Sequence, residues 1–199
     1  MLMAEGTEYF NPDEAAARIR KAIPGISQQE AQSAAWNQGR RLLERAITER
    51  LDFAFETTLG GNTISALLEK AMQTGIEVRI WYVGLASPEL HIERVRKRVS
   101  RGGHDIPEAK IRERYASSLL NLIRLLPHLS EFRLYDNSLQ ADLHTGAEPK
   151  PRLLLHLKKR QIVSLCDLIS TPNWAKPVLL AAIKISEHQQ SVPPAEPGA

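Results

Sequence analysis

The feature that most constrains the fold is a regular alternation of short apolar segments with longer amphipathic ones. Segments rich in aromatic and β-branched residues, at 8–10, 51–57, 77–85 and 131–135, are typical of strands. Between them lie segments with helical periodicity, at 12–21, 28–50, 63–74, 88–101 and 107–126. This alternation predicts parallel strands with crossover helices, so we expect an α/β fold.

The pattern changes after residue 150. Residues 152–157 and 161–165, joined by Lys158-Lys159-Arg160, are typical of a β-hairpin, and a short helix is expected near 174–185. The remaining segment, 186–199, is polar and rich in proline. We therefore expect a main domain over 1–150, a C-terminal hairpin and helix over 151–185, and a disordered tail over 186–199.

Charge is concentrated in one window. The chain has 199 residues and a net charge of +3, but residues 91–114 hold eight Lys or Arg against four Asp or Glu, which is 8 − 4 = +4. A local basic patch indicates one anionic group bound at one place, and it argues against a general nucleic-acid-binding surface. The single cysteine excludes an internal disulfide, and no apolar run is long enough to span a membrane, so a cytoplasmic protein is expected.

Two groups of polar residues follow predicted strands. Asp13 lies just past the first strand, where a carboxylate could take a proton from a substrate hydroxyl or help to hold Mg²⁺; the alternative is that it only favours the start of a helix. Glu56, Thr57 and Thr58 end the second strand, where they could bind a polar ligand or form a solvated strand end.

The basic window favours a helical hairpin. Arg94, Arg98 and Arg101 share one helix face by their i, i+4, i+7 spacing, glycines follow, and Arg112 and Arg114 begin the next helix. Inward-facing arginines on such a hairpin could form a lid over phosphate groups; the alternative is a solvated basic helix pair. No cluster of metal ligands occurs at a usable spacing, so no metal site is predicted from the residues alone.

Five segments in a fixed order carry a resemblance to a known family. They are Phe10-Asn11-Pro12-Asp13-Glu14, Phe53-Ala54-Phe55-Glu56-Thr57-Thr58-Leu59, Arg98 with Gly102-Gly103-His104-Asp105-Ile106-Pro107, Arg112-Glu113-Arg114-Tyr115, and Tyr135-Asp136-Asn137-Ser138. Over residues 8–138 the chain resembles the zeta-toxin-like P-loop kinases, and more closely the stand-alone members described as predicted ATPases.

The resemblance implies a P-loop kinase fold that uses ATP and Mg²⁺ to phosphorylate a small molecule. In zeta toxins the acceptor is the sugar hydroxyl of a UDP-N-acetylated amino sugar, and an antitoxin protein is a possible partner. Asp13 resembles the catalytic base, and Glu56, Thr57 and Thr58 resemble substrate-binding positions. Arg98, Arg112 and Arg114 resemble the arginines that meet the ATP phosphates, and Arg94 and Arg101 stay candidates beside them. We expect Arg98 and Arg114 to act in catalysis and Arg94, Arg101 and Arg112 to bind the ATP phosphates.

One departure from the family concerns the phosphate loop. Family members begin with an apolar strand and a G-x-x-x-x-G-K-[ST] loop, and no such sequence occurs in these 199 residues. Without that loop we expect the chain to be inactive, and without the central strand we expect its neighbours to lose pairing partners. We expect a truncated member of the kinase family, either because the true chain is longer or because the gene is a degenerate remnant. The alternative function is a non-catalytic module that binds an anion or a protein through the arginine hairpin.

Overall fold

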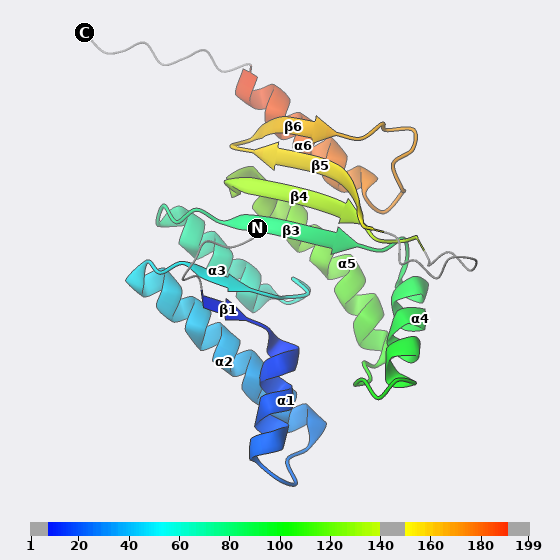
Figure 1. Cartoon of the computed structure of the whole chain (residues 1–199). Coiled ribbons are helices and arrows are strands. Elements are labelled where there is room, and N and C mark those ends of the chain that lie inside the picture. Colours follow the sequence, from blue (N-terminus) through cyan, green and yellow to red (C-terminus); the bar gives the residue numbers. More distant parts are fainter. Residues whose placement is uncertain (1–7, 140–149, 191–199) are drawn as a thin grey trace. The chain divides into compact units, whose positions relative to one another are not determined.

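The computed structural model describes residues 8–139 and 150–190. These residues form a mixed α/β structure with six α-helices, a two-stranded sheet and a four-stranded sheet (Figure 1). By its internal contacts the chain divides into two compact units, Met1–Ile76 and Glu77–Ala199, which are described separately.

The first unit contains β1 (Glu8–Phe10), α1 (Pro12–Ala22), α2 (Gln28–Glu49), β2 (Phe53–Phe55) and α3 (Asn62–Gln73). Strands β1 and β2 pair in parallel, as the alternating pattern predicts. Local signals set the helix starts: Pro12 occupies the first turn of α1, and Ser27 forms a capping box with Glu30 at the start of α2. One core cluster consists of Phe10 with small residues of α1 and α2, which let the two helices approach closely.

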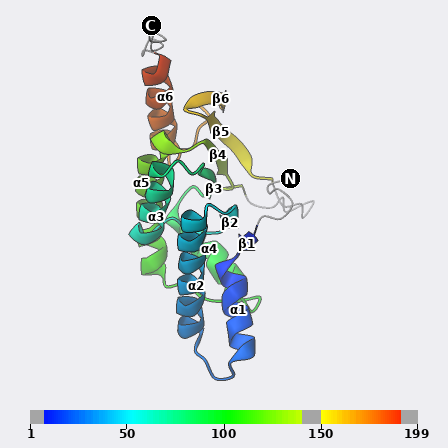
Figure 2. The same cartoon turned by 90° about the vertical axis from the view of Figure 1, so that its left-hand side faces the viewer.

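The second unit contains eight elements, counted over the described residues. They are β3 (Arg79–Gly84), α4 (Pro88–Val99), α5 (Glu108–Leu125), a 3₁₀ turn (Leu126–His128), β4 (Glu131–Asp136), β5 (Arg152–Lys158), β6 (Gln161–Leu165) and α6 (Lys176–Gln190). The strand order is β3-β4-β5-β6; β3 and β4 are parallel, and the other two pairs are antiparallel. Figures 1 and 2 show α5 and α6 on one face of this sheet.

The predicted C-terminal hairpin is confirmed as β5 and β6, and it extends the sheet of β3 and β4. Leu154, Leu155 and Leu157 of β5 are fully buried beside Phe132 and Leu134 of β4. Residues 151–190 therefore belong to the same compact unit as β3 and β4, whereas the sequence had set them apart at residue 150.

The predicted disordered tail was expected to begin at residue 186, but helix α6 extends beyond that position. Helix α6 continues through Ser186 to Gln190, because Ser186 lies four residues after Ala182, on the buried face of the helix. The small Ser186 side chain fits this buried face, although the polar sequence from residue 186 onward predicts disorder. The rest of the predicted tail, 191–199, lies outside the described residues.

The predicted loss of a central strand concerns two sheet edges. Within the described part of the first unit, β2 pairs with β1 alone; within that of the second unit, β3 pairs with β4 alone. Each therefore has one side without a strand of its own unit. That a further strand belongs beside them stays a prediction.

Candidate functional site

The first group of predicted site residues lies at the carboxyl ends of β1 and β2. The parallel register places Phe10 opposite Phe55, and the backbone N–H of Glu56 donates to the carbonyl of Phe10 at 3.1 Å. The residues that follow the two strands, Asn11 and Glu56, consequently lie side by side. This is the edge of a parallel sheet at which α/β proteins place their ligands.

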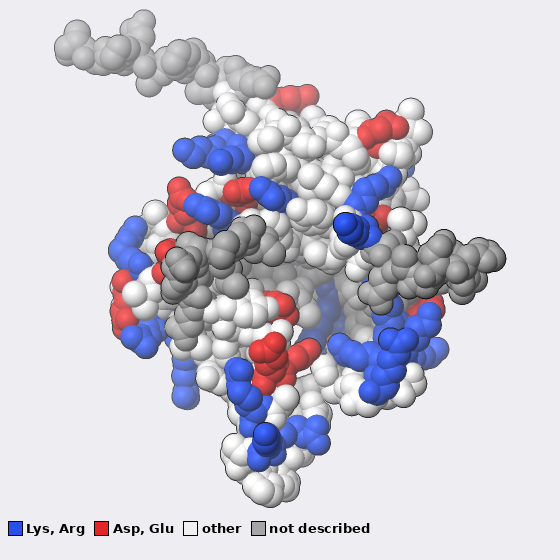
Figure 3. Space-filling view, viewed as in Figure 1, with Lys and Arg blue, Asp and Glu red and all other residues white. Residues whose placement is uncertain are grey.

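Asn11 joins the two predicted carboxylate positions. Its Oδ1 accepts the backbone N–H groups of Asp13 at 2.9 Å and Glu14 at 3.2 Å, which caps helix α1. Its Nδ2 donates to Oε2 of Glu56 at 3.1 Å. One amide side chain thus fixes the start of the helix that carries Asp13 and the carboxylate of Glu56. Figure 3 shows acidic side chains gathered where β1 leads into α1.

Tyr9 is a second contact of Glu56, and no sequence pattern singles it out. Its hydroxyl donates to Oε1 of Glu56. This hydrogen bond is the main reason that the pKa of Tyr9 lies above its ordinary value of 10, with desolvation as a smaller cause. Alternation along β1 could have placed Tyr9 and Asn11 on the same face, but only the pairing of β1 with β2 shows that Glu56 shares it.

The segment after Glu56 folds back on itself. The Thr57 hydroxyl accepts the backbone N–H of Leu59 at 3.1 Å, and Leu59 is buried with a left-handed backbone, φ +55°. A non-glycine residue in this region carries strain, which burial of its side chain offsets. Thr57 therefore has a local structural role, whereas Thr58 is exposed and bears its hydroxyl on the surface.

The second group of predicted site residues lies on α4, α5 and their connection. Ser87 caps α4 with Pro88 in its first turn, and the connection to α5 contains Gly102, which has φ +86°. This confirms the predicted helix–glycine–helix hairpin. Figure 3 shows Lys and Arg side chains gathered over α4.

Three of these arginines bind neighbouring protein groups. Arg94 donates to the carbonyls of Asn137 at 2.6 Å and Leu139 at 3.2 Å, so it holds the segment that follows β4. Arg98 donates to the carbonyl of His104 at 3.2 Å and lies 3.3 Å from its ring Nε2. Arg94 is thus tied to the segment after β4, and Arg98 to the connection between α4 and α5.

Across the hairpin, the third of them, Arg112 on α5, pairs with Glu89 on α4 at 2.6 Å. The pairing lowers the pKa of Glu89 through the hydrogen bond from Arg112. In contrast, the side chains of Arg101 and Arg114 are exposed and form no ion pair or hydrogen bond with the residues that the structure describes. Arg101, predicted to bind the ATP phosphates, and Arg114, predicted to act in catalysis, thus keep their guanidinium donors open.

A further polar contact in the second unit lies at the carboxyl ends of β3 and β4. Oδ1 of Asp136 accepts the N–H of Ser138 at 3.2 Å and the indole N–H of Trp174 at 3.3 Å. Gly84 lies beneath the Trp174 ring, where a Cβ atom would overlap it. The Tyr135-Asp136-Asn137-Ser138 segment is therefore a structural corner, anchored by a tryptophan that the sequence did not single out.

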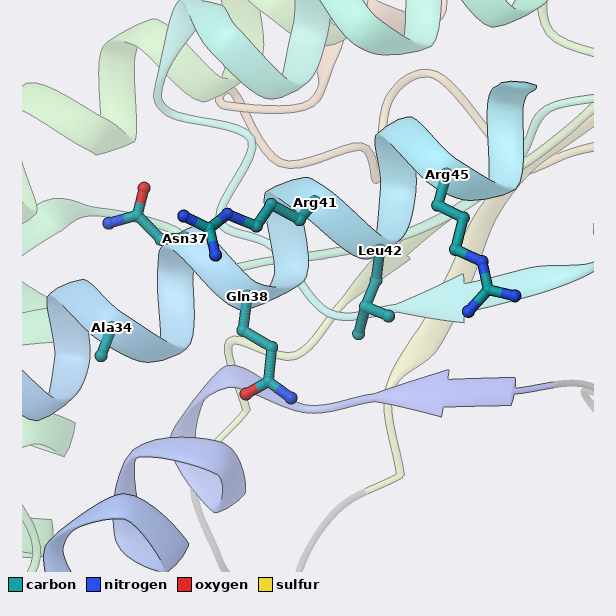
Figure 4. A pocket seen from close by; sticks show the side chains of 6 residues that line it. All are labelled: Ala34, Asn37, Gln38, Arg41, Leu42 and Arg45. Atoms are coloured by element: carbon teal, nitrogen blue, oxygen red, sulfur yellow. The ribbon is translucent and has the colours of Figure 1, made fainter. Parts of the chain in front are cut away.

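Neither of the two best-defined cavities in the described part of the chain is lined by a predicted site residue. One, of about 620 Å³, is lined by side chains of α2 alone: Ala34, Asn37, Gln38, Arg41, Leu42 and Arg45. In Figure 4, Gln38 and Leu42 extend from α2 toward β1 and the start of α1. The other, of about 420 Å³, lies between α4 and α5 and is mainly apolar.

Over 8–139 and 150–190, no group of three or more His, Cys, Asp or Glu side chains is arranged to hold a metal ion. Within the same ranges, no helix is both long and apolar enough to span a membrane.

Comparisons with known proteins place the chain beside two others. No family model matches it. A Haemophilus influenzae protein called "Uncharacterized protein" is 35% identical over 74 residues, which are 37% of this chain and 53% of that protein. The chain thus spans about half the length of that curated relative. A structure from a study of the PezAT chromosomal toxin–antitoxin system of Streptococcus pneumoniae covers 92% of this chain and 76% of its own, with 11% identity and a TM-score of 0.44, which does not establish a shared fold.

Proposed function

We propose that this chain carries the acceptor-binding and phosphate-contacting parts of an ATP-dependent small-molecule kinase of the zeta-toxin type. The observation that carries the proposal is the network at the ends of β1 and β2, where Asn11 links the start of the Asp13 helix to the Glu56 carboxylate. The order of the five family-like segments supports the same reading.

The roles of the acceptor side follow from carboxylate chemistry. Each oxygen of Glu56 accepts one protein donor, from Tyr9 or Asn11, and keeps a second lone pair for a substrate hydroxyl. Asp13 lies in the first turn of α1 and would accept the proton of the attacking hydroxyl as a general base. Glu56 would thus orient the acceptor, a sugar hydroxyl of a UDP-amino sugar, and Asp13 would activate it.

The phosphate side rests on the arginine hairpin. Arg101 and Arg114 would contact the ATP phosphates with their open donors, and Arg98 and Arg112 could join them by exchanging their present protein partners. The 199 residues hold no G-x-x-x-x-G-K-[ST] loop, and the described part offers no cluster of metal ligands. The Ser or Thr hydroxyl of that loop, which helps to hold Mg²⁺ in P-loop kinases, therefore has no counterpart in this sequence.

The acceptor side can be tested on the chain as it is. Titration with UDP-N-acetylglucosamine, followed by amide chemical shifts, is expected to perturb the signals of Asn11, Asp13 and Thr57. Glu56→Gln should weaken binding, whereas Glu49→Gln, a matched exposed carboxylate on α2, should not. No perturbation at any of these amides in the folded wild-type chain would refute the assignment.

Phosphoryl transfer needs a second experiment. The chain itself is expected to show no ATP turnover. A chimera in which a zeta-toxin strand, phosphate loop and following helix precede Glu8 should phosphorylate the sugar nucleotide, and Asp13→Ala in that chimera should abolish transfer while leaving ATP binding. Unchanged turnover after Asp13→Ala would remove Asp13 from the mechanism.

The open arginines favour a second candidate function, an anion-binding or protein-binding module without catalysis. It predicts that the chain binds ATP or pyrophosphate, measured by calorimetry, with no turnover in any form that contains the phosphate loop. Arg101→Ala and Arg114→Ala should each weaken binding, whereas Arg41→Ala on α2 should not. An antitoxin would be the protein partner of such a module, and its binding would show the same dependence on the two arginines.

A further inference from the structure

Strand β6 forms an open edge of the four-stranded sheet. It pairs with β5 on one side, and no described strand of the same unit lies on its other side (Figure 1). An edge strand presents backbone N–H and C=O groups that another strand can pair with. What covers this edge therefore depends on its sequence and its charge.

The sequence of β6 lacks the residues that usually protect an edge. Gln161-Ile162-Val163-Ser164-Leu165 contains no charged residue and no proline. Val163 is 58% exposed at the centre of the strand, and Ile169 is 93% exposed just beyond it. The register pairs Leu157 with Ile162 and His156 with Ser164, so Val163 has no partner on β5. This bulge leaves the central residue of the edge free to pair outward.

The two ends of β6 carry opposite charge. The basic turn Lys158-Lys159-Arg160 leads into the strand, and Asp167 follows it two residues after Leu165. Figure 3 shows an uncharged surface over β6, with basic atoms at the turn end and acidic atoms at the other end. When two such strands pair antiparallel about a two-fold axis near Val163, each basic turn meets the Asp167 of the other copy.

We propose that β6 is a dimerisation edge, which pairs antiparallel with β6 of a second copy and joins two four-stranded sheets into one. A two-fold axis makes the contact self-complementary and closed, because the same patch serves both copies. A five-residue strand offers a small interface, of the class below about 1,200 Å² that forms weak, transient contacts. The dimer should therefore dissociate on dilution and weaken with added salt.

Sedimentation velocity over a range of concentrations tests the dimer. The wild-type chain is expected to shift from monomer to dimer as its concentration rises. Val163→Glu places two carboxylates across the axis and should weaken dimerisation by about tenfold or more, whereas Val163→Thr should retain it. Val83→Glu is the matched control, since Val83 is 52% exposed on β3 at the other edge of the same sheet. A chain that stays monomeric, or an equal loss with Val83→Glu, would overturn the proposal.

A cross-link tests the register. Residues opposite each other in an antiparallel pair have Cα atoms about 4.5–5.5 Å apart, within the range of about 4.4–6.8 Å that a disulfide spans. With Cys166→Ser removing the native thiol, Val163→Cys should form an intermolecular disulfide under mild oxidation and Val83→Cys should not. Cross-linking at residue 83 and not at residue 163 would show that the copies associate through another edge, and would refute the pairing.

Discussion

Replacing Asn11 should separate its two structural roles. Asn11→Ala removes the Oδ1 acceptor for the N–H groups of Asp13 and Glu14, and it also removes the donor to Glu56. Loss of an N-cap side chain typically costs about 1 kcal/mol, within a range of about 0.5–2. If the unit Met1–Ile76 unfolds by itself, a loss of that size lowers its melting temperature by about 4–8 °C. If the whole chain unfolds in one transition, the shift is about 2–4 °C.

Asn11→Asp is the matched variant. Its carboxylate caps a helix as well as an amide does, and it favours the positive end of the helix dipole, but it has no donor for Glu56. Thermal unfolding followed by circular dichroism should place Asn11→Asp nearer to the wild type than Asn11→Ala, whereas UDP-N-acetylglucosamine binding should weaken in both. Equal melting temperatures for Asn11→Ala and the wild type, or equal losses in the two variants, would refute the capping argument.

Two further predictions concern packing and ionisation. Gly84→Ala should destabilise the chain by about 1–3 kcal/mol in urea unfolding, because the added methyl group overlaps the Trp174 ring, and Trp174→Phe should recover part of that loss; full additivity of the two changes would contradict the contact. The hydrogen bond to Glu56 raises the pKa of Tyr9 above 10, so Glu56→Gln should lower that pKa in an absorbance titration assigned with Tyr9→Phe. The stability from this pair is present below pH 10 and is lost as the pH rises through the raised pKa; an unchanged Tyr9 titration in Glu56→Gln would count against it.

The sequence predicted the order and type of the elements well, because proline, glycine and N-cap residues mark the ends of the helices. Pro12 opens α1, Ser87 and Pro88 open α4, and Gly102 follows the end of α4, each as expected. These signals act within one or two turns of chain, so the residues themselves determine them. The sequence did not predict that α6 extends to Gln190, because the burial of Ser186 depends on packing against the rest of the unit.

The contacts of the candidate site could not be predicted in the same way. Tyr9 and Glu56 are 47 positions apart, and they meet because β1 and β2 pair in one parallel register. A shift of one residue would turn Glu56 to the other face of the sheet and remove the contact. A single sequence carries no signal for that register. The roles of Asp13, Glu56, Thr57 and Thr58 in a reaction stay predictions.

The positive charge that the arginine hairpin offers to a ligand depends on the protein groups that its arginines already contact. From composition, residues 91–114 carry a surplus of four positive charges. In the folded unit Arg112 forms an ion pair with Glu89, which lies outside residues 91–114. Arg94 and Arg98 donate hydrogen bonds to backbone carbonyls. A bound phosphate would have to displace these contacts or use Arg101 and Arg114. Because those two need give up no protein partner among the described residues, they should dominate anion binding, and the other arginines should act mainly by holding the helices and segments in place.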